Sequence, residues 1–239
     1  MFTRTVRVQP SDVSCDGRLK LKRLIDYFQD TASMAVEPIE GTASELAQRG
    51  YAWVLSRYEI DFTGKMPSID EYFDITTFHD PSHGYNTLRI FKVTSKGNLI
   101  IHAKSSWFLV DIKAGRVVKA LAHLPEIMTD AEEINPDFRE IPDFEEVTGA
   151  VKVPVTYHAL DYNSHVNNAV YFEWLFDALP DEVQRKDLKS ISASFRSGLK
   201  LGEDAVLEFN AGEDITNFRL IKNSVKKPSA IFSIHSRWN

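Results

Sequence analysis

Cysteine is the scarcest informative residue in this chain of 239 residues, which contains only Cys15. One cysteine excludes an intramolecular disulfide framework and a zinc site made of several thiolates. It is typical of a reducing compartment, so we expect a cytoplasmic protein. No stretch approaches the roughly 20 apolar residues of a membrane-spanning helix, and the start of the chain lacks the apolar core of a signal peptide. We therefore expect neither membrane insertion nor export.

The chain also lacks the short motifs of several large enzyme classes. It has no GxSxG segment, which argues against a serine hydrolase of the nucleophile-elbow type. Neither GxGxxG nor GxxxxGKS/T occurs, so dinucleotide and nucleotide chemistry is not indicated, and we expect no cofactor. The net charge of −6 gives no general attraction to polyanions, so we expect no nucleic-acid partner.

What the chain does contain is a pattern that occurs twice. Two amphipathic helices are predicted from apolar residues at positions i, i+3, i+4 and i+7. The two patterns stand 150 residues apart, and just upstream Asp12 and Asp161 stand 149 residues apart, which indicates a duplicated unit. The apolar positions are Leu21, Leu24, Ile25 and Phe28 in the first pattern and Tyr171, Trp174, Leu175 and Ala178 in the second.

Each predicted helix is followed by alternating segments that are typical of antiparallel strands. An antiparallel sheet buries one long apolar helix by curling around it, so we predict an α+β double hot-dog of two fused units. We expect a first unit at residues 1–130, an exposed linker at 131–148 and a second unit at 149–239. The predicted strands are 54–62, 72–78, 86–93 and 99–110, then 190–195, 205–210, 218–222 and 230–238.

The segment DYNSHVNN, residues 161–168, is the candidate active site. In extended backbone alternate side chains share one face, so Asp161, Asn163 and His165 are expected to converge as catalytic residues. The next helix is expected to begin at Val166, Asn167 and Asn168, whose backbone N–H groups would bind substrate or an oxyanion. This combination suits the addition of water to an acyl carbonyl.

Structural explanations for the same residues stay open. Asn167 and Asn168 are also ordinary helix caps, and His165 is a structural histidine on the other interpretation. A metal site is not favoured, because a third ligand is not visible nearby. Cys15 is interpreted as structural or incidental rather than as a nucleophile.

Two further comparisons within the sequence bear on the site. At the offset of 149 residues Asn163 corresponds to Ser14 and His165 to Asp16, so only the second copy has the full polar set. The second half also carries cations that we interpret as an exposed group able to steer an acidic partner. They are Arg185, Lys186, Lys189, Lys200, Lys222, Lys226, Lys227 and Arg237.

The motif DxNxHVNN, followed by the aromatic segment YFEW (171–174), resembles the acyl-ACP thioesterases of bacteria and plants. The segments LIDYFQDTA (24–32), YAWVLSR (51–57), SSWFLVD (105–111) and GRVVK (115–119) follow the family's order, so the resemblance runs nearly end to end. It implies a double hot-dog that cleaves the thioester of a fatty acyl chain on acyl carrier protein. It also implies Asp161, Asn163 and His165 as the catalytic residues, and a first copy that lines much of the acyl tunnel.

One departure from the family matters for the chemistry. Many members have a glutamate on the strand after the second helix, where this chain has Gly198. The water-activating base is then His165 or Asp161, or a carboxylate from elsewhere such as Glu173. An acyl-CoA thioesterase, a hot-dog hydratase or dehydratase, and a non-catalytic acyl-binding module are the alternative functions. A fused pair of units is compatible with a monomer or a homodimer.

Overall fold

The computed structural model describes residues 1–124, 134–222 and 227–237. The chain divides into two compact units, residues 1–20 with 26–138 and residues 21–25 with 139–239. In the described ranges no helix has both the length and the apolar character needed to cross a bilayer.

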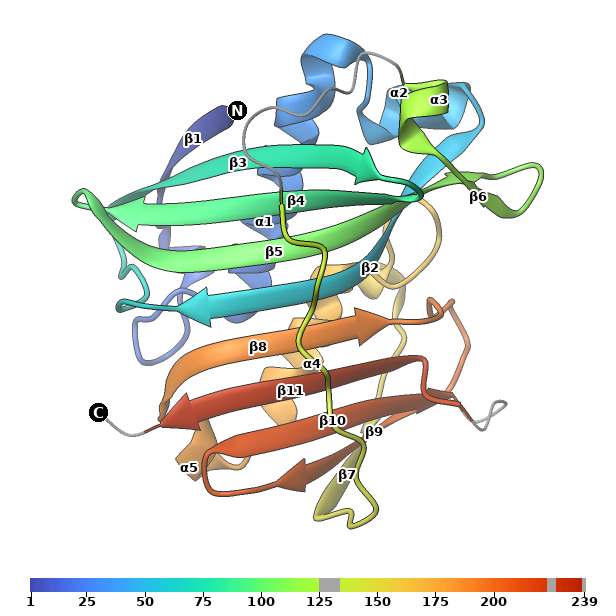
Figure 1. The fold of residues 1–239 in the computed structure, drawn as a ribbon. Coiled ribbons are helices and arrows are strands. Elements are labelled where there is room, and N and C mark those ends of the chain that lie inside the picture. Colours follow the sequence, from blue (N-terminus) through green and yellow to red (C-terminus); the bar gives the residue numbers. More distant parts are fainter. Residues whose placement is uncertain (125–133, 223–226, 238–239) are drawn as a thin grey trace. The chain divides into compact units, whose positions relative to one another are not determined.

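The first unit is an antiparallel sheet in the order β1-β3-β4-β5-β2, with the short strand β6 on β5 (Figure 1). Its strands are β1 (Phe2–Arg7), β2 (Tyr51–Phe62), β3 (Tyr72–His83), β4 (Asn86–Ser95), β5 (Asn98–Asp111) and β6 (Arg116–Val118). Its helices are η1 (Pro10–Asp12), α1 (Leu21–Val36), η2 (Glu37–Ile39), α2 (Ala43–Gln48) and α3 (Ala120–His123).

The core of the first unit lies between α1 and the sheet. Phe28 of α1 stacks on Phe91 of β4, with ring centroids 4.6 Å apart, and its ring is 6.5 Å from that of Tyr58 on β2. All three side chains are fully buried, and burying each large apolar side chain contributes about 1.5–3 kcal/mol. The four apolar positions predicted for this helix are all buried, so the predicted helix and its buried face are confirmed.

The second unit has the order β7-β9-β10-β11-β8, which repeats the topology of the first. In both units the strand before the long helix takes one edge of the sheet, and the first strand after that helix takes the other. The predicted double hot-dog is therefore confirmed. The elements are β7 (Gly149–Val153), η3 (Tyr157–Ala159), α4 (Asn168–Ala178), α5 (Asp181–Gln184), β8 (Asp187–Phe195), β9 (Ala205–Ala211), β10 (Ile215–Lys222) and β11 (Ala230–Arg237).

In the second unit α4 lies against the sheet (Figure 1), and aromatic side chains pack between the helix and the strands. Phe195 of β8 meets Tyr171 of α4 edge to face at 5.4 Å and Phe232 of β11 edge to face at 5.6 Å. Such pairs stabilise a core by about 0.5–1.5 kcal/mol beyond the area that they bury. They fix α4, and with it the start of the helix at which the candidate site lies.

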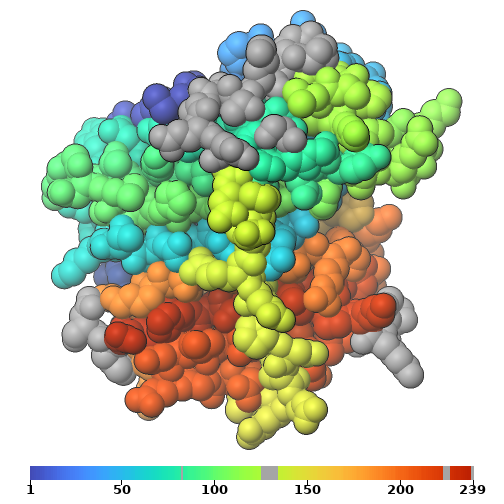
Figure 2. Space-filling model, in the orientation of Figure 1, coloured from blue at the N-terminus to red at the C-terminus, as the bar shows by residue number. Residues whose placement is uncertain are grey.

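The segment before β7 was expected to be an exposed linker, and this expectation is wrong in part. Residues 131–133 lie outside the described ranges, but Ile134 and Ile141 are only 5% and 8% exposed. In the first unit Ile134 packs with Phe78, Leu88 and Ile90 on the outer face of the sheet. Figure 2 shows the described part of this segment as a yellow ridge on the surface.

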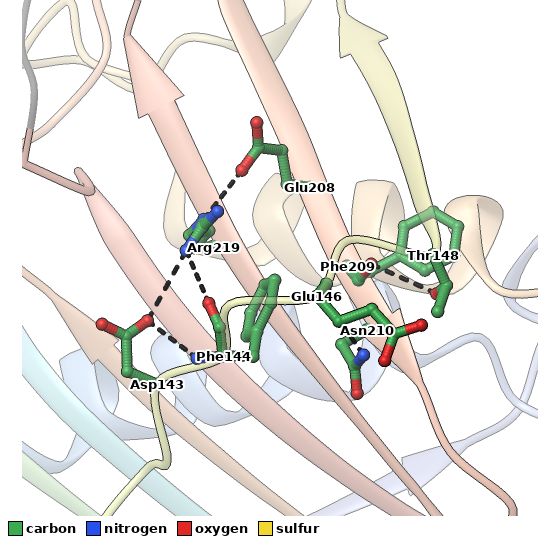
Figure 3. A network of polar contacts seen from close by, with 8 residues as sticks. All are labelled: Asp143, Phe144, Glu146, Thr148, Glu208, Phe209, Asn210 and Arg219. Carbon is green, nitrogen blue, oxygen red and sulfur yellow. Dashed lines mark hydrogen bonds and ion pairs between the residues drawn. The ribbon is translucent and has the colours of Figure 1, made fainter.

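The end of the same segment is held on the second sheet by polar contacts (Figure 3). Arg219 of β10 lies over the ring of Phe144 at 4.6 Å and donates to the Phe144 carbonyl at 2.9 Å. Its Nε also donates to Glu208 of β9 at 2.7 Å. The Asn210 amide donates to the Glu146 carbonyl at 2.9 Å. Residues 144–146 are therefore a strap on this sheet rather than a free linker.

Candidate active site

The segment from Asp161 to His165 forms a tight turn, so the prediction of extended backbone is wrong. The amide of Asp161 donates to the carbonyl of His165 at 2.7 Å, and the amide of Ser164 donates back to the carbonyl of Asp161 at 3.0 Å. Ser164 takes a positive φ of 61°, and the flanking residues Leu160 and Val166 form an isolated antiparallel bridge. The turn closes because a short aspartate side chain competes well for nearby backbone amides.

Asp161 holds this turn through its carboxylate. Its Oδ1 accepts hydrogen bonds from the amide of Asn163 at 2.8 Å and from the amide of His165 at 3.1 Å. Both donors are backbone groups of the turn itself. The carboxylate therefore sets the backbone path of the turn. Asn163 and His165 lie on this one loop and do not alternate along a strand.

His165 is oriented by a hydrogen bond within the same turn. Its Nδ1 lies 3.0 Å from the carbonyl oxygen of Asn163. A carbonyl oxygen only accepts, so Nδ1 must carry the proton, and the lone pair of the neutral ring is then on Nε2. The His165 side chain is half-buried, whereas Asn163 is exposed. This arrangement leaves Nε2 as the nitrogen that can accept a proton.

Two of the three backbone amides predicted to bind substrate or an oxyanion already donate to protein carbonyls at the start of α4. The amide of Val166 donates to the Leu199 carbonyl at 2.8 Å, and the amide of Asn167 donates to the Ala159 carbonyl at 2.9 Å. Asn167 is the N-cap, and its side chain accepts from the Ala169 amide at 2.8 Å, which confirms the capping interpretation for this residue. Asn168 is the first helical residue, and its amide has no carbonyl within the helix to reach.

Gly198 lies directly against the imidazole of His165. A Cβ atom at position 198 would stand 2.8 Å from Cδ2 of His165 and 3.3 Å from its Cγ. A side chain at this position would require the ring to move. The observed orientation of His165 thus depends on the absence of the glutamate that the family resemblance would place here. Glu173, considered above as a replacement carboxylate, is exposed on α4.

The first unit contains the same turn with different chemistry. The amide of Ser14 donates to the carbonyl of Arg18 at 2.9 Å, as the amide of Asp161 does to His165, and Gly17 takes the positive φ that Ser164 has in the second unit. The structural offset is therefore 147 residues, which is also the distance between the first residues of α1 and α4. The structural counterparts of Asp161, Asn163 and His165 are, in order, Ser14, Asp16 and Arg18.

The predicted pairing of Asp12 with Asp161 is therefore wrong by two residues. Asp12 is buried and accepts a hydrogen bond from the Tyr27 hydroxyl at 2.6 Å, which is a structural role in the first core. In the place of the imidazole the first unit has Arg18, whose Nε donates to Asp16 at 2.6 Å. Only the second turn combines an imidazole with a helix N-terminus.

Two functional candidates were missed by the sequence analysis. The hydroxyl of Tyr171 accepts a hydrogen bond from the Leu199 amide at 3.3 Å, and burial raises the pKa of Tyr171 to about 12. Lys222, which was grouped with exposed cations, has a side chain only 13% exposed and donates to the Gly198 carbonyl. Lys186 of that group is also buried, and Lys226 lies outside the described residues.

No metal site accompanies the turn within residues 1–124, 134–222 and 227–237, where no group of three His, Cys, Asp or Glu side chains is arranged to hold an ion.

Two domain models of one known protein family match this chain. The acyl-ACP thioesterase N-terminal domain matches residues 1–128, and the C-terminal domain of the same family matches residues 145–239. The chain belongs to the acyl-ACP thioesterase family. The candidate turn lies within the C-terminal domain of that family.

Individual relatives agree with this assignment. An acyl-[acyl-carrier-protein] hydrolase of Cuphea viscosissima is 23% identical over 226 residues, covering 87% of this chain and 54% of that protein. The chain thus spans about half the length of the curated relatives that it matches. A crystal structure of an acyl-ACP thioesterase from Bacteroides thetaiotaomicron has a TM-score of 0.86 at 21% identity, covering 99% of this chain and 97% of that one. A 12:0-ACP thioesterase from Umbellularia californica has a TM-score of 0.87 at 16% identity, with coverage of 99% and 96%.

Proposed function

We propose that this chain hydrolyses the thioester between a fatty acyl chain and acyl carrier protein, releasing the free fatty acid and the carrier thiol. The observation that carries the proposal is the hydrogen bond between Nδ1 of His165 and the carbonyl of Asn163, which leaves Nε2 as a base. Family membership supports the same reaction class.

In the proposed mechanism water attacks the thioester carbonyl directly. Nε2 of His165 takes the proton from the water and returns it to the thiolate that leaves. The helix N-terminus, through the amide of Asn168, stabilises the negative charge on the carbonyl oxygen in the tetrahedral intermediate. The exposed side chain of Asn163 positions the water or an amide of the pantetheine arm. Asp161 acts by holding the turn in which both residues lie.

The thiol-release assay separates this function from its alternatives. The purified chain is incubated with short, medium and long acyl chains on acyl carrier protein and, in parallel, on coenzyme A. Faster release from the carrier protein supports the proposal, and faster release from coenzyme A indicates an acyl-CoA thioesterase instead. Gly198 favours a non-catalytic acyl-binding module as the second candidate, and binding of acyl carrier protein without thiol release would identify it.

The base is tested by replacing His165. Loss of a well-placed acid–base group typically costs about 10²–10⁴ in rate, so His165→Gln and His165→Ala are both expected to fall in that range. The exposed His158→Gln provides a control on the same approach to the helix. Near-normal turnover in the His165 variants, with the control also active, would remove His165 from the mechanism.

The proposal includes the partner, the cellular location and the assembly of the protein. Acyl carrier protein is the proposed partner, because the family model that matches is that of acyl-ACP thioesterases. A cytoplasmic location is supported by the single cysteine, which is exposed and free. The assembly is proposed to be a monomer or a homodimer, and light scattering coupled to size exclusion distinguishes them.

A further inference from the structure

The loop that follows β8 provides the surface on which the His165 ring rests. Its backbone is held at successive peptide groups, starting where the carbonyl of Ser229 accepts from the amides of Arg196 and Ser197 at 2.9 and 3.0 Å. The next peptide group, at Gly198, has the imidazole against its Cα. A glycine has no side chain to restrict its backbone, so the orientation of this peptide depends on what its neighbours bind.

The carbonyl and the amide of Leu199 both form hydrogen bonds, one with the segment before α4 and one with α4 itself. Its carbonyl accepts from the amide of Val166, and its amide donates to the hydroxyl of Tyr171. These two bonds secure the side of the loop toward the helix. Neither bond involves the carbonyl of Gly198, which is bound from a different element.

Lys222 supplies that contact. It is the last residue of β10, and its Nζ donates to the carbonyl oxygen of Gly198 at 2.5 Å. The Lys222 side chain is 13% exposed, whereas Gly198, whose carbonyl it contacts, is exposed. A charged donor makes a stronger hydrogen bond to a carbonyl than a neutral donor does.

Glu203 holds the ammonium in place. Its carboxylate oxygens lie 3.2 and 3.3 Å from Nζ of Lys222, and one of them accepts the Lys200 amide at 2.7 Å. Burial acts to raise the pKa of Glu203, but the hydrogen bonds from the Lys200 amide and the Lys222 ammonium lower it overall. Glu203 is thus an anion that ties Lys222 to the same loop.

We propose that Lys222, anchored by Glu203, is a positioning residue for His165. Its ammonium fixes the carbonyl of Gly198 and thereby the glycine surface against which the imidazole packs. This inference rests on the proposed function, because it assumes that the orientation of His165 matters for turnover. It assigns to a lysine of a neighbouring strand the task of rigidifying a site that has no side chain at position 198.

The test compares three substitutions in the pair of Lys222 and Glu203, which we call the brace. Lys222→Met removes the charged donor at similar length, Lys222→Arg retains one, and Glu203→Gln removes the anionic anchor while leaving Lys222 in place. Lys222→Met is expected to lower kcat about tenfold with KM changed less than about twofold, because the loss is one of orientation. Lys222→Arg is expected to recover most of kcat, and Glu203→Gln to lie between Lys222→Met and the wild type. The matched control is Lys200→Met, an exposed lysine of the same loop that contacts Glu203 through its backbone amide.

A direct readout on His165 keeps the brace and the proposed function separate. The ring resonances of His165 are followed by NMR, and in Lys222→Met they are expected to broaden or split, whereas in Lys200→Met they are expected to stay sharp. Unchanged His165 resonances in Lys222→Met, an unaltered kcat, or an equal loss in Lys200→Met would each overturn the inference. A wild-type chain without thioesterase activity would refute the proposed function instead, and the resonances would still report on the brace.

Discussion

The Cβ atom that Gly198 lacks would stand 2.8 Å from Cδ2 of His165, so the imidazole occupies space that any side chain at this position would need. Gly198→Ala is therefore expected to displace the ring. A misplacement of about 1 Å in an active site can cost on the order of 100-fold in rate, and we expect a loss of about 10- to 100-fold in kcat. Steady-state thiol release with acyl carrier protein substrates measures it.

The neighbouring Ser197→Ala serves as the control for this substitution, because Ser197 is exposed and its amide, not its side chain, makes the bond to Ser229. Gly198→Glu, which introduces the glutamate that the resemblance implies at this position, is expected to lose activity for the same steric reason. A rate above that of the wild type in either Gly198 variant would contradict this account of the ring.

Asp161 offers a test of whether its charge or its hydrogen bonds matter. Asparagine keeps an Oδ1 that can accept from the amides of Asn163 and His165, whereas alanine keeps neither bond. Asp161→Ala is expected to lower the free energy of unfolding by about 1–3 kcal/mol and to abolish most activity, whereas Asp161→Asn retains a larger share of both. Urea denaturation and thiol release are measured on the same preparations. Equal inactivation, with Asp161→Asn as stable as the wild type, would show that the carboxylate takes part in the chemistry.

The lowered pKa of His102 predicts that the stability of the protein depends on pH. Burial lowers its pKa, Lys92 and Lys104 lower it as well, and Asp61 opposes them. The unfolded chain, with a histidine pKa of about 6.5, takes up a proton before the folded chain does, so stability is lost as pH falls through about 6.5 toward the lower folded value. Above that window the contribution is fully present. His102→Gln should therefore lose less stability between about pH 7.5 and about pH 5.5 than the wild type.

Denaturant midpoints at both pH values measure this difference, and Asp61→Asn provides a second test. Removing the carboxylate removes the interaction that favours protonated His102. The acid-induced loss of stability should then become larger than in the wild type. A smaller loss in Asp61→Asn would mean that another group causes the pH dependence.

Arg219→Met is expected to loosen the strap of residues 144–146. The guanidinium contacts the Phe144 ring, the Phe144 carbonyl and Glu208, and losing such contacts costs about 1–2 kcal/mol. Cleavage after Glu145 or Glu146 by a glutamate-specific protease should become about 10-fold faster, since local opening precedes cleavage. Arg237→Met is the control, because Arg237 is 62% exposed and its ion pair with Asp214 is long at 3.9 Å. Equal cleavage rates in both variants would exclude the strap as the cause.

The sheets and long helices could be predicted because their signal is periodic. Leu24 and Phe28 recur at the spacing of a helix face, and both are fully buried. The edge strands β1 and β7 were not delimited, because an edge strand has little burial to impose alternation: in β7 only Val153 is buried. The short helices α2, α3 and α5 carry too few turns to show a period.

The composition of the candidate site could be predicted, but its shape could not. Alternating polar residues suggested extended backbone, whereas the hydrogen bonds from Asp161 to two amides close a turn. The positive φ of Ser164 leaves no mark in the sequence, because serine is not a residue that signals this conformation. Gly17 does signal it in the first unit, but its counterpart Ser164 does not, so the offset of 147 residues became evident only from the two turns in the structure.

The brace at Lys222 could not be predicted for a different reason. Lys222 and Gly198 are 24 residues apart, and only the pairing of β9 with β10 brings the end of β10 to this loop. A single lysine at a strand end has the same local pattern as any solvated surface cation. Its partner is a backbone carbonyl, so no complementary side chain marks the contact.

The two turns of this protein lie at separate positions of one chain. In a protein built from two identical chains, each substitution appears in both copies, and a residue needed for reaction in one must be tolerated in the other. Here Arg18 and His165 occupy equivalent corners yet can change independently. One half is consequently free to change while the other keeps its imidazole, and of the two turns only the second carries this side chain.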